Sequence, residues 1–99
     1  MNLKQVLDTD DYVLIDFYSK NCPPCRVQEE VLSQINTEGL KIFQVDRDKH
    51  PEIAKAFSVS NVPFLYLFKH KKPIAAEAGI LDPEKLRSWL KEKTDGNIQ

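Results

Sequence analysis

The two cysteines of this 99-residue chain, Cys22 and Cys25, are the residues whose type and spacing most directly suggest chemistry. A disulfide between them would close a very small loop, so it could restrict the unfolded chain only weakly. Cys22 follows an apolar run that is typical of a buried strand, and it stands where a helix is expected to begin. The free N–H groups and partial positive charge at a helix N-terminus favour a thiolate over a thiol. Because the thiolate is the nucleophile in disulfide exchange, this pattern predicts a redox-active pair.

Cys25 is placed to complete a reaction that Cys22 begins. Its position about one helical turn further on is expected to be more sheltered, and from there it could attack a mixed disulfide at Cys22 and release the product. Arg26 adds positive charge nearby. Pro23 and Pro24 have no N–H, so the backbone N–H of Cys25 is the expected local donor to the Cys22 sulfur.

One acidic residue, Asp16, interrupts the apolar run Tyr12–Tyr18 that precedes the cysteines. Such a run is typical of a central strand that is buried on both faces, although an acid on a solvent-facing side of the strand is the alternative. A carboxyl group buried there should have a raised pKa, because burial disfavours its charged form. A raised pKa suits acid–base work near neutral pH, which makes Asp16 a candidate site residue.

Helical and strand periodicities alternate along the chain and define the elements that must position these residues. The expected helices cover 2–8, 23–36, 51–57 and 83–93, and the expected strands cover 12–18, 40–45, 64–68 and 74–78. Strand–helix–strand connections imply parallel pairing, whereas the short polar turn between the last two strands implies an antiparallel hairpin. The sequence therefore predicts an α/β fold, with a mixed four-stranded sheet that has helices on both faces. In that sheet, 40–45 is a partly exposed edge strand.

The chain is expected to fold as one domain spanning 1–99, because its length does not allow a second hydrophobic core. Asp82 should cap the last helix, with Pro83 at its first position. Residues 94–99 are expected to form a frayed tail.

Composition excludes several classes of partner and site. The formal net charge of −1 gives no reason to expect binding to nucleic acid or to an anionic membrane. The chain lacks both a long apolar run and the apolar core of a secretory signal, so a cytoplasmic location is expected. A zinc site is disfavoured, because the cysteine pair would need two further ligands and the histidines are His50 and His70.

Three segments together resemble the thioredoxin family: Val13–Tyr18, Cys22–Arg26 and Val62–Phe64. The resemblance extends from about residue 3 to 93. A two-cysteine motif alone is only moderately specific for this family. The same motif after a buried strand, with Val-Pro before a later strand, is a strong indication of it. The resemblance implies the thioredoxin fold, with a short fifth edge strand as an alternative to four strands.

The resemblance also implies roles for individual residues. Cys22 corresponds to the attacking cysteine and Cys25 to the resolving cysteine, while Asp16 corresponds to a buried acid that assists proton transfer to and from the resolving thiol. Pro63 matches the family's cis-proline, which faces the disulfide and aligns an extended substrate chain. Val62 would offer backbone groups to that chain.

Further positions of the expected substrate-binding site are Gly79, Asn21 and Pro23. Gly79 matches a glycine that lets the substrate approach closely. Asn21 replaces the family's usual tryptophan before the first cysteine and makes the rim more polar, whereas Pro23 replaces a glycine and stiffens the turn. Gln44 stands where a lysine is often found, so Asp16 loses a charge partner, and Glu30 replaces a helix-kinking proline.

By resemblance, the expected function is reduction of disulfides in other proteins, with no cofactor beyond the Cys22–Cys25 disulfide. A separate reductase, such as a thioredoxin reductase, would regenerate the dithiol, and the chain is expected to be a monomer. Alternatives are a disulfide oxidant or isomerase, a glutaredoxin-like protein that uses glutathione, and a non-catalytic binding module. The single glycine at Gly79 favours thioredoxin over glutaredoxin, and the presence of both cysteines disfavours a pure binding module.

Overall fold

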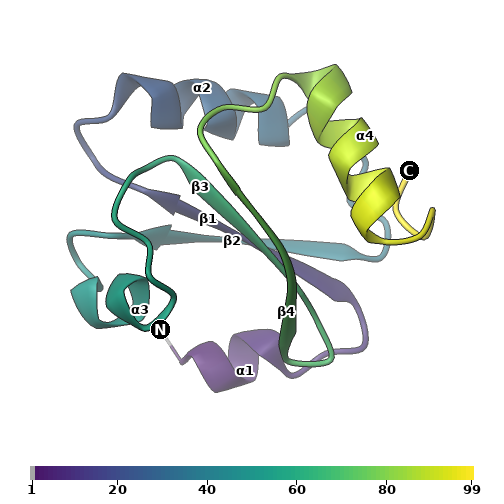
Figure 1. Cartoon of the computed structure of the whole chain (residues 1–99), viewed down its shortest axis with the longest axis horizontal. Helices are drawn as coiled ribbons and strands as arrows, with labels where there is room; N and C mark the ends of the chain where they lie inside the picture. Colours follow the sequence, from purple (N-terminus) through teal and green to yellow (C-terminus); the bar gives the residue numbers. More distant parts are fainter. Residues whose placement is uncertain (1) are drawn as a thin grey trace.

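The computed structural model describes residues 2–99, which form four helices and four strands (Figure 1). In chain order these are α1 (Leu3–Leu7), β1 (Tyr12–Tyr18), α2 (Pro23–Leu32), β2 (Leu40–Asp46), α3 (Pro51–Ala56), β3 (Phe64–Lys69), β4 (Lys72–Ala78) and α4 (Pro83–Lys93). The element order predicted from sequence is therefore confirmed. No helix within residues 2–99 is long and apolar enough to cross a membrane.

The strands form one mixed sheet in the order β2-β1-β3-β4. β1 pairs parallel with β2 and antiparallel with β3, and β3 pairs antiparallel with β4. The predicted four-stranded sheet is confirmed, β2 lies at an edge as expected, and residues 2–99 add no fifth strand to it.

The direction of β3 differs from the prediction that strand–helix–strand connections give parallel strands. β3 runs antiparallel to β1, and therefore also to β2, although α3 lies between β2 and β3 in the chain. A parallel return would have to recross the sheet, whose seven-residue strands are about 23 Å long. The six-residue α3 spans only about 9 Å. The connection instead returns the chain to the sheet at the end where it left, on the other side of β1.

Helices cover both faces of the sheet, as predicted. α2 and α4 lie on one face and α1 and α3 on the other (Figure 1). Successive β1 side chains point to opposite faces, so Leu14 packs with the α2 and α4 residues, whereas Ile15 and Phe17 pack with the α1 and α3 residues. Residues 12–17 of β1 are all buried, which is why the run is apolar except at Asp16.

α2 ends at Leu32, before the predicted end at residue 36. Ile35 lies beyond the helix in a turn but is still only 9% exposed and packs in the same core as Leu32. The apolar periodicity therefore continues after the helical backbone has stopped. The start of α4 is as predicted, because the side chain of Asp82 accepts a hydrogen bond from the Lys85 N–H at 2.9 Å and Pro83 opens the helix.

The expectation of a frayed tail at 94–99 is wrong. Thr94 is 1% exposed and Ile98 3% exposed, and Ile98 belongs to the core beneath α2 and α4. The Thr94 hydroxyl donates to the Leu90 carbonyl at 2.6 Å and accepts from the Ile98 N–H at 2.9 Å. Gly96 adopts a positive φ of 82°, the backbone geometry that commonly ends a helix and turns the chain back. The tail therefore docks because an apolar residue follows this turn.

Candidate active site

The sheet topology brings the cysteines and the Val-Pro segment to one edge. β1 and β2 end there, with Tyr18 beside Asp46, and β3 begins there, with Phe64 beside Phe17. The loops that follow β1 and precede β3 therefore meet, although they are far apart in sequence. The candidate site lies between these two loops.

Cys22 and Cys25 are joined by a disulfide, with their Cα atoms 5.2 Å apart. Cys22 is the N-cap of α2, and its Sγ accepts a hydrogen bond from the Cys25 N–H at 3.2 Å. This is the donor expected from the absence of N–H groups at Pro23 and Pro24. A thiolate at Cys22 would be stabilised by the same N–H and by the helix N-terminus.

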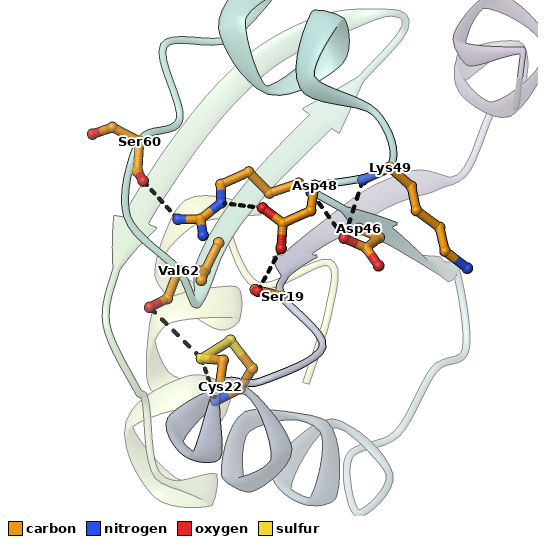
Figure 2. Close-up of polar contacts among 9 residues, drawn as sticks. Ser19, Cys22, Asp46, Asp48, Lys49, Ser60 and Val62 are labelled. Atoms are coloured by element: carbon orange, nitrogen blue, oxygen red, sulfur yellow. Dashed lines mark hydrogen bonds and ion pairs between the residues drawn. A yellow bond between two sulfur atoms is a disulfide. The ribbon is translucent and has the colours of Figure 1, made fainter.

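The two sulfur-bearing residues differ in exposure and surroundings. Cys22 is 9% exposed and Cys25 is 3% exposed, so Cys25 is the more sheltered of the two, as the sequence suggested. The Cys22 Sγ lies 4.0 Å from the carbonyl oxygen of Val62, and Figure 2 shows this oxygen directed at the disulfide. Cys22 is thus the cysteine whose sulfur faces the Val62 carbonyl.

Asp16 lies on the face of β1 that α2 covers, and its side chain is fully buried. Burial raises the pKa of its carboxyl group from 3.8 to about 6. A hydrogen bond from Gln44 Nε2 to Oδ2 (3.4 Å) opposes this increase, while the negative charge of Glu29 adds to it. Oδ1 has no hydrogen-bond partner among residues 2–99. The raised pKa expected from sequence is therefore present, and Gln44 is the neighbour that was expected in place of a lysine.

Val62 and Pro63 are joined by a cis peptide bond, as the resemblance implied. The Pro63 carbonyl accepts a hydrogen bond from the Gly79 N–H at 3.0 Å, which brings the residue after β4 beside the Val-Pro segment. Gly79 has a φ of 84°, and a Cβ there would meet no atom within 4 Å. The space beside Gly79 is therefore open. Asn21 and Pro23 are exposed on either side of Cys22.

Gln28 is a residue of this region that the sequence analysis did not single out. It is fully buried on α2, one turn after Cys25. Its Nε2 donates to the Leu81 carbonyl at 3.3 Å and its Oε1 accepts from the Leu81 N–H at 2.9 Å. The amide thus ties α2 to the segment that follows Gly79. Its signal in the sequence was a polar residue at a core-facing position of an amphipathic helix.

A chain of polar contacts beside the disulfide was also missed, and we call Ser19, Asp48, Arg47 and the Ser60 carbonyl the polar bridge (Figure 2). The Ser19 hydroxyl donates to Asp48 at 2.7 Å, and Asp48 lies 3.5 Å from Arg47 Nε. Arg47 Nη1 donates to the Ser60 carbonyl at 2.9 Å. These residues come from three separate loops, so local sequence patterns could not group them.

Within residues 2–99, no group of three or more histidine, cysteine or acidic side chains is arranged to hold a metal ion. The sequence argument against a zinc site rested on the lack of two further ligands for the cysteine pair. In the structure, both cysteine sulfurs are engaged with each other in the disulfide.

Comparisons with known proteins agree with this geometry. The thioredoxin family model matches residues 2–92. A thioredoxin of Buchnera aphidicola is 29% identical over 92 residues, which cover 90% of this chain and 85% of that protein. A thioredoxin-like protein of Synechocystis is 31% identical over 81 residues, which cover 79% of this chain and 77% of that protein. The structure of a mutant thioredoxin from Halobacterium salinarum superposes with a TM-score of 0.81 at 29% identity, covering 93% of this chain and 82% of that one. With its disulfide at the start of α2 and its cis Val62–Pro63 segment opposite, the chain belongs to the thioredoxin family of thiol–disulfide oxidoreductases.

Proposed function

We propose that Cys22 is the attacking cysteine and Cys25 the resolving cysteine in the reduction of protein disulfides. In the reduced protein, the Cys22 thiolate attacks one sulfur of a substrate disulfide, breaks that bond and releases a substrate thiolate. Cys25 then attacks Cys22 Sγ, and this breaks the mixed disulfide and releases the second substrate thiolate. The products are the Cys22–Cys25 disulfide and a substrate dithiol, which has gained two electrons and two protons.

The observation that carries this assignment is the hydrogen bond from the Cys25 N–H to Cys22 Sγ at the N-terminus of α2. It supports a stabilised thiolate at Cys22, which is also the more exposed cysteine. Asp16, with a pKa of about 6, is mostly ionised at neutral pH and suited to accept the proton of the Cys25 thiol. Asp16 is therefore proposed as the base for the resolving step.

The experiment is insulin reduction by the wild-type protein and by two single variants, with dithiothreitol as electron donor. We expect Cys22→Ser to abolish turnover, because no mixed disulfide can form at serine. After dithiothreitol has been removed, reduced Cys25→Ser should accumulate the mixed disulfide with insulin, which intact-protein mass spectrometry detects as a covalent adduct at Cys22. Undiminished turnover by Cys22→Ser would overturn the assignment.

For the substrate, we propose an extended chain that lies along Val62 and Pro63 and passes Gly79. The Val62 carbonyl is 4.0 Å from Cys22 Sγ, so a chain bonded to Val62 would bring its own sulfur to Cys22. The open space beside Gly79 supports the same path. Asn21 and Pro23 are proposed to form the rim that this chain crosses.

We further propose that a separate reductase, such as a thioredoxin reductase, regenerates the dithiol and that the protein acts as a monomer. No cofactor beyond the disulfide is needed for the exchange steps written above, because electrons move between sulfur atoms. A protein reductant must be kept reduced, and the cytoplasm is the compartment where thiols are maintained in that state. We therefore propose a cytoplasmic location.

A further inference from the structure

We propose that the polar bridge is a positioning device: it holds the segment 60–62 at a set distance from the Cys22 loop and so favours the binding of protein disulfides. The proposal rests on the proposed function, because it assumes that substrate lies along Val62. Arg47 is its central member, since its guanidinium contacts both sides of the bridge. Within residues 2–99, the side chain of Arg47 bonds to Asp48 and to the Ser60 carbonyl and to neither cysteine, so Arg47 is a positioning residue here.

The start of the segment 60–62 has little else to hold it, although Val62 at its end packs against the core that α1 and α3 cover. Val59 is anchored by a hydrogen bond from its N–H to the Ala54 carbonyl at 2.8 Å, and the Pro63 carbonyl is anchored by Gly79. Between these two anchors, residues 60–62 make two polar contacts with other parts of residues 2–99. Arg47 donates a hydrogen bond to the Ser60 carbonyl, and the Val62 carbonyl lies beside Cys22 Sγ. Ser60 and Asn61 are exposed, so packing does not restrain them. The Arg47 side chain therefore restrains the backbone two residues before Val62.

The other end of the bridge is fixed to the loop that carries the disulfide. Ser19 lies three residues before Cys22, and its hydroxyl holds Asp48 at 2.7 Å. The Arg47 N–H donates to the Tyr18 carbonyl at 2.8 Å, which continues the pairing with β1 one residue beyond β2. Buried Asp46 accepts from the Asp48 N–H at 2.8 Å and so fixes the turn that carries both charged residues. The segment 60–62 and the loop that carries Cys22 are thus both hydrogen-bonded to this one turn.

The charges of the bridge persist at neutral pH. The Ser19 hydrogen bond lowers the pKa of Asp48, and Arg47 lowers it further. Arginine stays protonated, and its planar guanidinium can serve the Asp48 carboxylate and the Ser60 carbonyl at the same time. Lysine at this position would keep the charge but could not contact both partners with the same fixed geometry.

Solvent exposure sets the size of the expected effect. The side chains of Arg47 and Asp48 are 33% and 61% exposed. Exposed ion pairs contribute little to stability, so removal of the bridge should leave the fold intact and change only the position of the loop. An effect of about threefold to fivefold on substrate binding is expected from contacts of this strength.

The test compares wild type with Arg47→Ala, Arg47→Lys and Lys49→Ala. Lys49 is the matched control, because it is an exposed cation on the same turn whose side chain points away from the bridge (Figure 2). For each protein, KM and kcat are measured for insulin reduction with dithiothreitol as donor. Hydrogen–deuterium exchange of peptides that cover 58–63 is followed by mass spectrometry in the same proteins.

For Arg47→Ala we expect a KM about threefold to fivefold higher, a kcat within about twofold of wild type, and faster exchange across 58–63. Arg47→Lys should recover these properties only in part, and Lys49→Ala should match wild type. Unchanged exchange or unchanged KM in Arg47→Ala would overturn the proposal, as would full recovery by lysine or an equal effect of Lys49→Ala. Failure of wild type to reduce insulin would refute the proposed function together with the substrate half of this proposal. The exchange measurement decides the positioning half separately.

Discussion

At the scale of single residues, the buried carboxyl group of Asp16 couples ionisation to folding. Its pKa rises from 3.8 to about 6 in the folded protein, chiefly because burial disfavours the charge. The folded state therefore binds the proton more tightly than the unfolded chain between these two values. The free energy of unfolding falls as pH rises from about 4 to about 6 and stays lower above that range.

Asp16→Asn is therefore expected to stabilise the protein at pH 7, because an amide carries no charge to bury. The change of pKa from 3.8 to about 6 corresponds to about 3 kcal/mol in the free energy of unfolding. Urea denaturation of both proteins at pH 7 and at about pH 2.5 measures it, and the gain should vanish at the lower pH, where wild-type Asp16 is neutral in both states because the pH lies more than a unit below 3.8. An equal gain at both pH values would show that the ionisation of Asp16 is not its cause.

At the scale of elements, Gln28 joins α2 to the segment that leads into α4. Its amide satisfies both the N–H and the carbonyl of Leu81 from a fully buried position. A leucine has a similar volume but can satisfy neither group. The cost of Gln28→Leu is therefore set by unpaired backbone polar groups and not by lost packing.

Gln28→Leu should lower the free energy of unfolding by about 2 kcal/mol for this reason. Gln34→Leu is the matched control, because Gln34 is exposed just after the same helix and the substitution should change stability by less than about 0.5 kcal/mol. Urea denaturation of the oxidised proteins gives both values. Equal effects of the two substitutions would mean that the Leu81 contacts do not contribute.

The segment after α4 is a second element whose contribution can be measured. Ile98 is 3% exposed in the core beneath α2 and α4, so Ile98→Ala should destabilise the protein by about 2 kcal/mol. Ile74→Ala is the control, since Ile74 is 42% exposed. Thermal or urea unfolding compares the two variants, and a tail that was frayed in solution would give equally small changes at both positions.

At the scale of the whole molecule, the sheet order β2-β1-β3-β4 creates the site. β1 and β2 end, and β3 begins, at one edge, so the Cys22 loop, the turn with Arg47 and the Val62–Pro63 segment meet there. None of these segments is close to another in sequence. The site is therefore a product of topology, with local chemistry supplied by the start of α2.

Much of this architecture could be predicted from the sequence, because the pattern of apolar residues reports burial. This pattern identified β1 as central and Asp16 as buried, and the two prolines between the cysteines marked the start of α2. The same pattern misplaced the end of α2, since Ile35 is buried in a turn, and it could not reveal the direction of β3. The polar bridge could not be predicted from the sequence, because its contacts join loops that are far apart in the chain.

The measurement that tests the central claim most directly is the reduction potential of the Cys22–Cys25 pair. The protein is equilibrated in graded dithiothreitol buffers, its free thiols are alkylated, and the oxidised and reduced fractions are counted by mass. For a reductant of protein disulfides we predict a reduction potential of about −270 mV, below that of disulfide isomerases at about −180 mV. A potential at or above the isomerase value, or a pair that never forms a disulfide, would contradict the account.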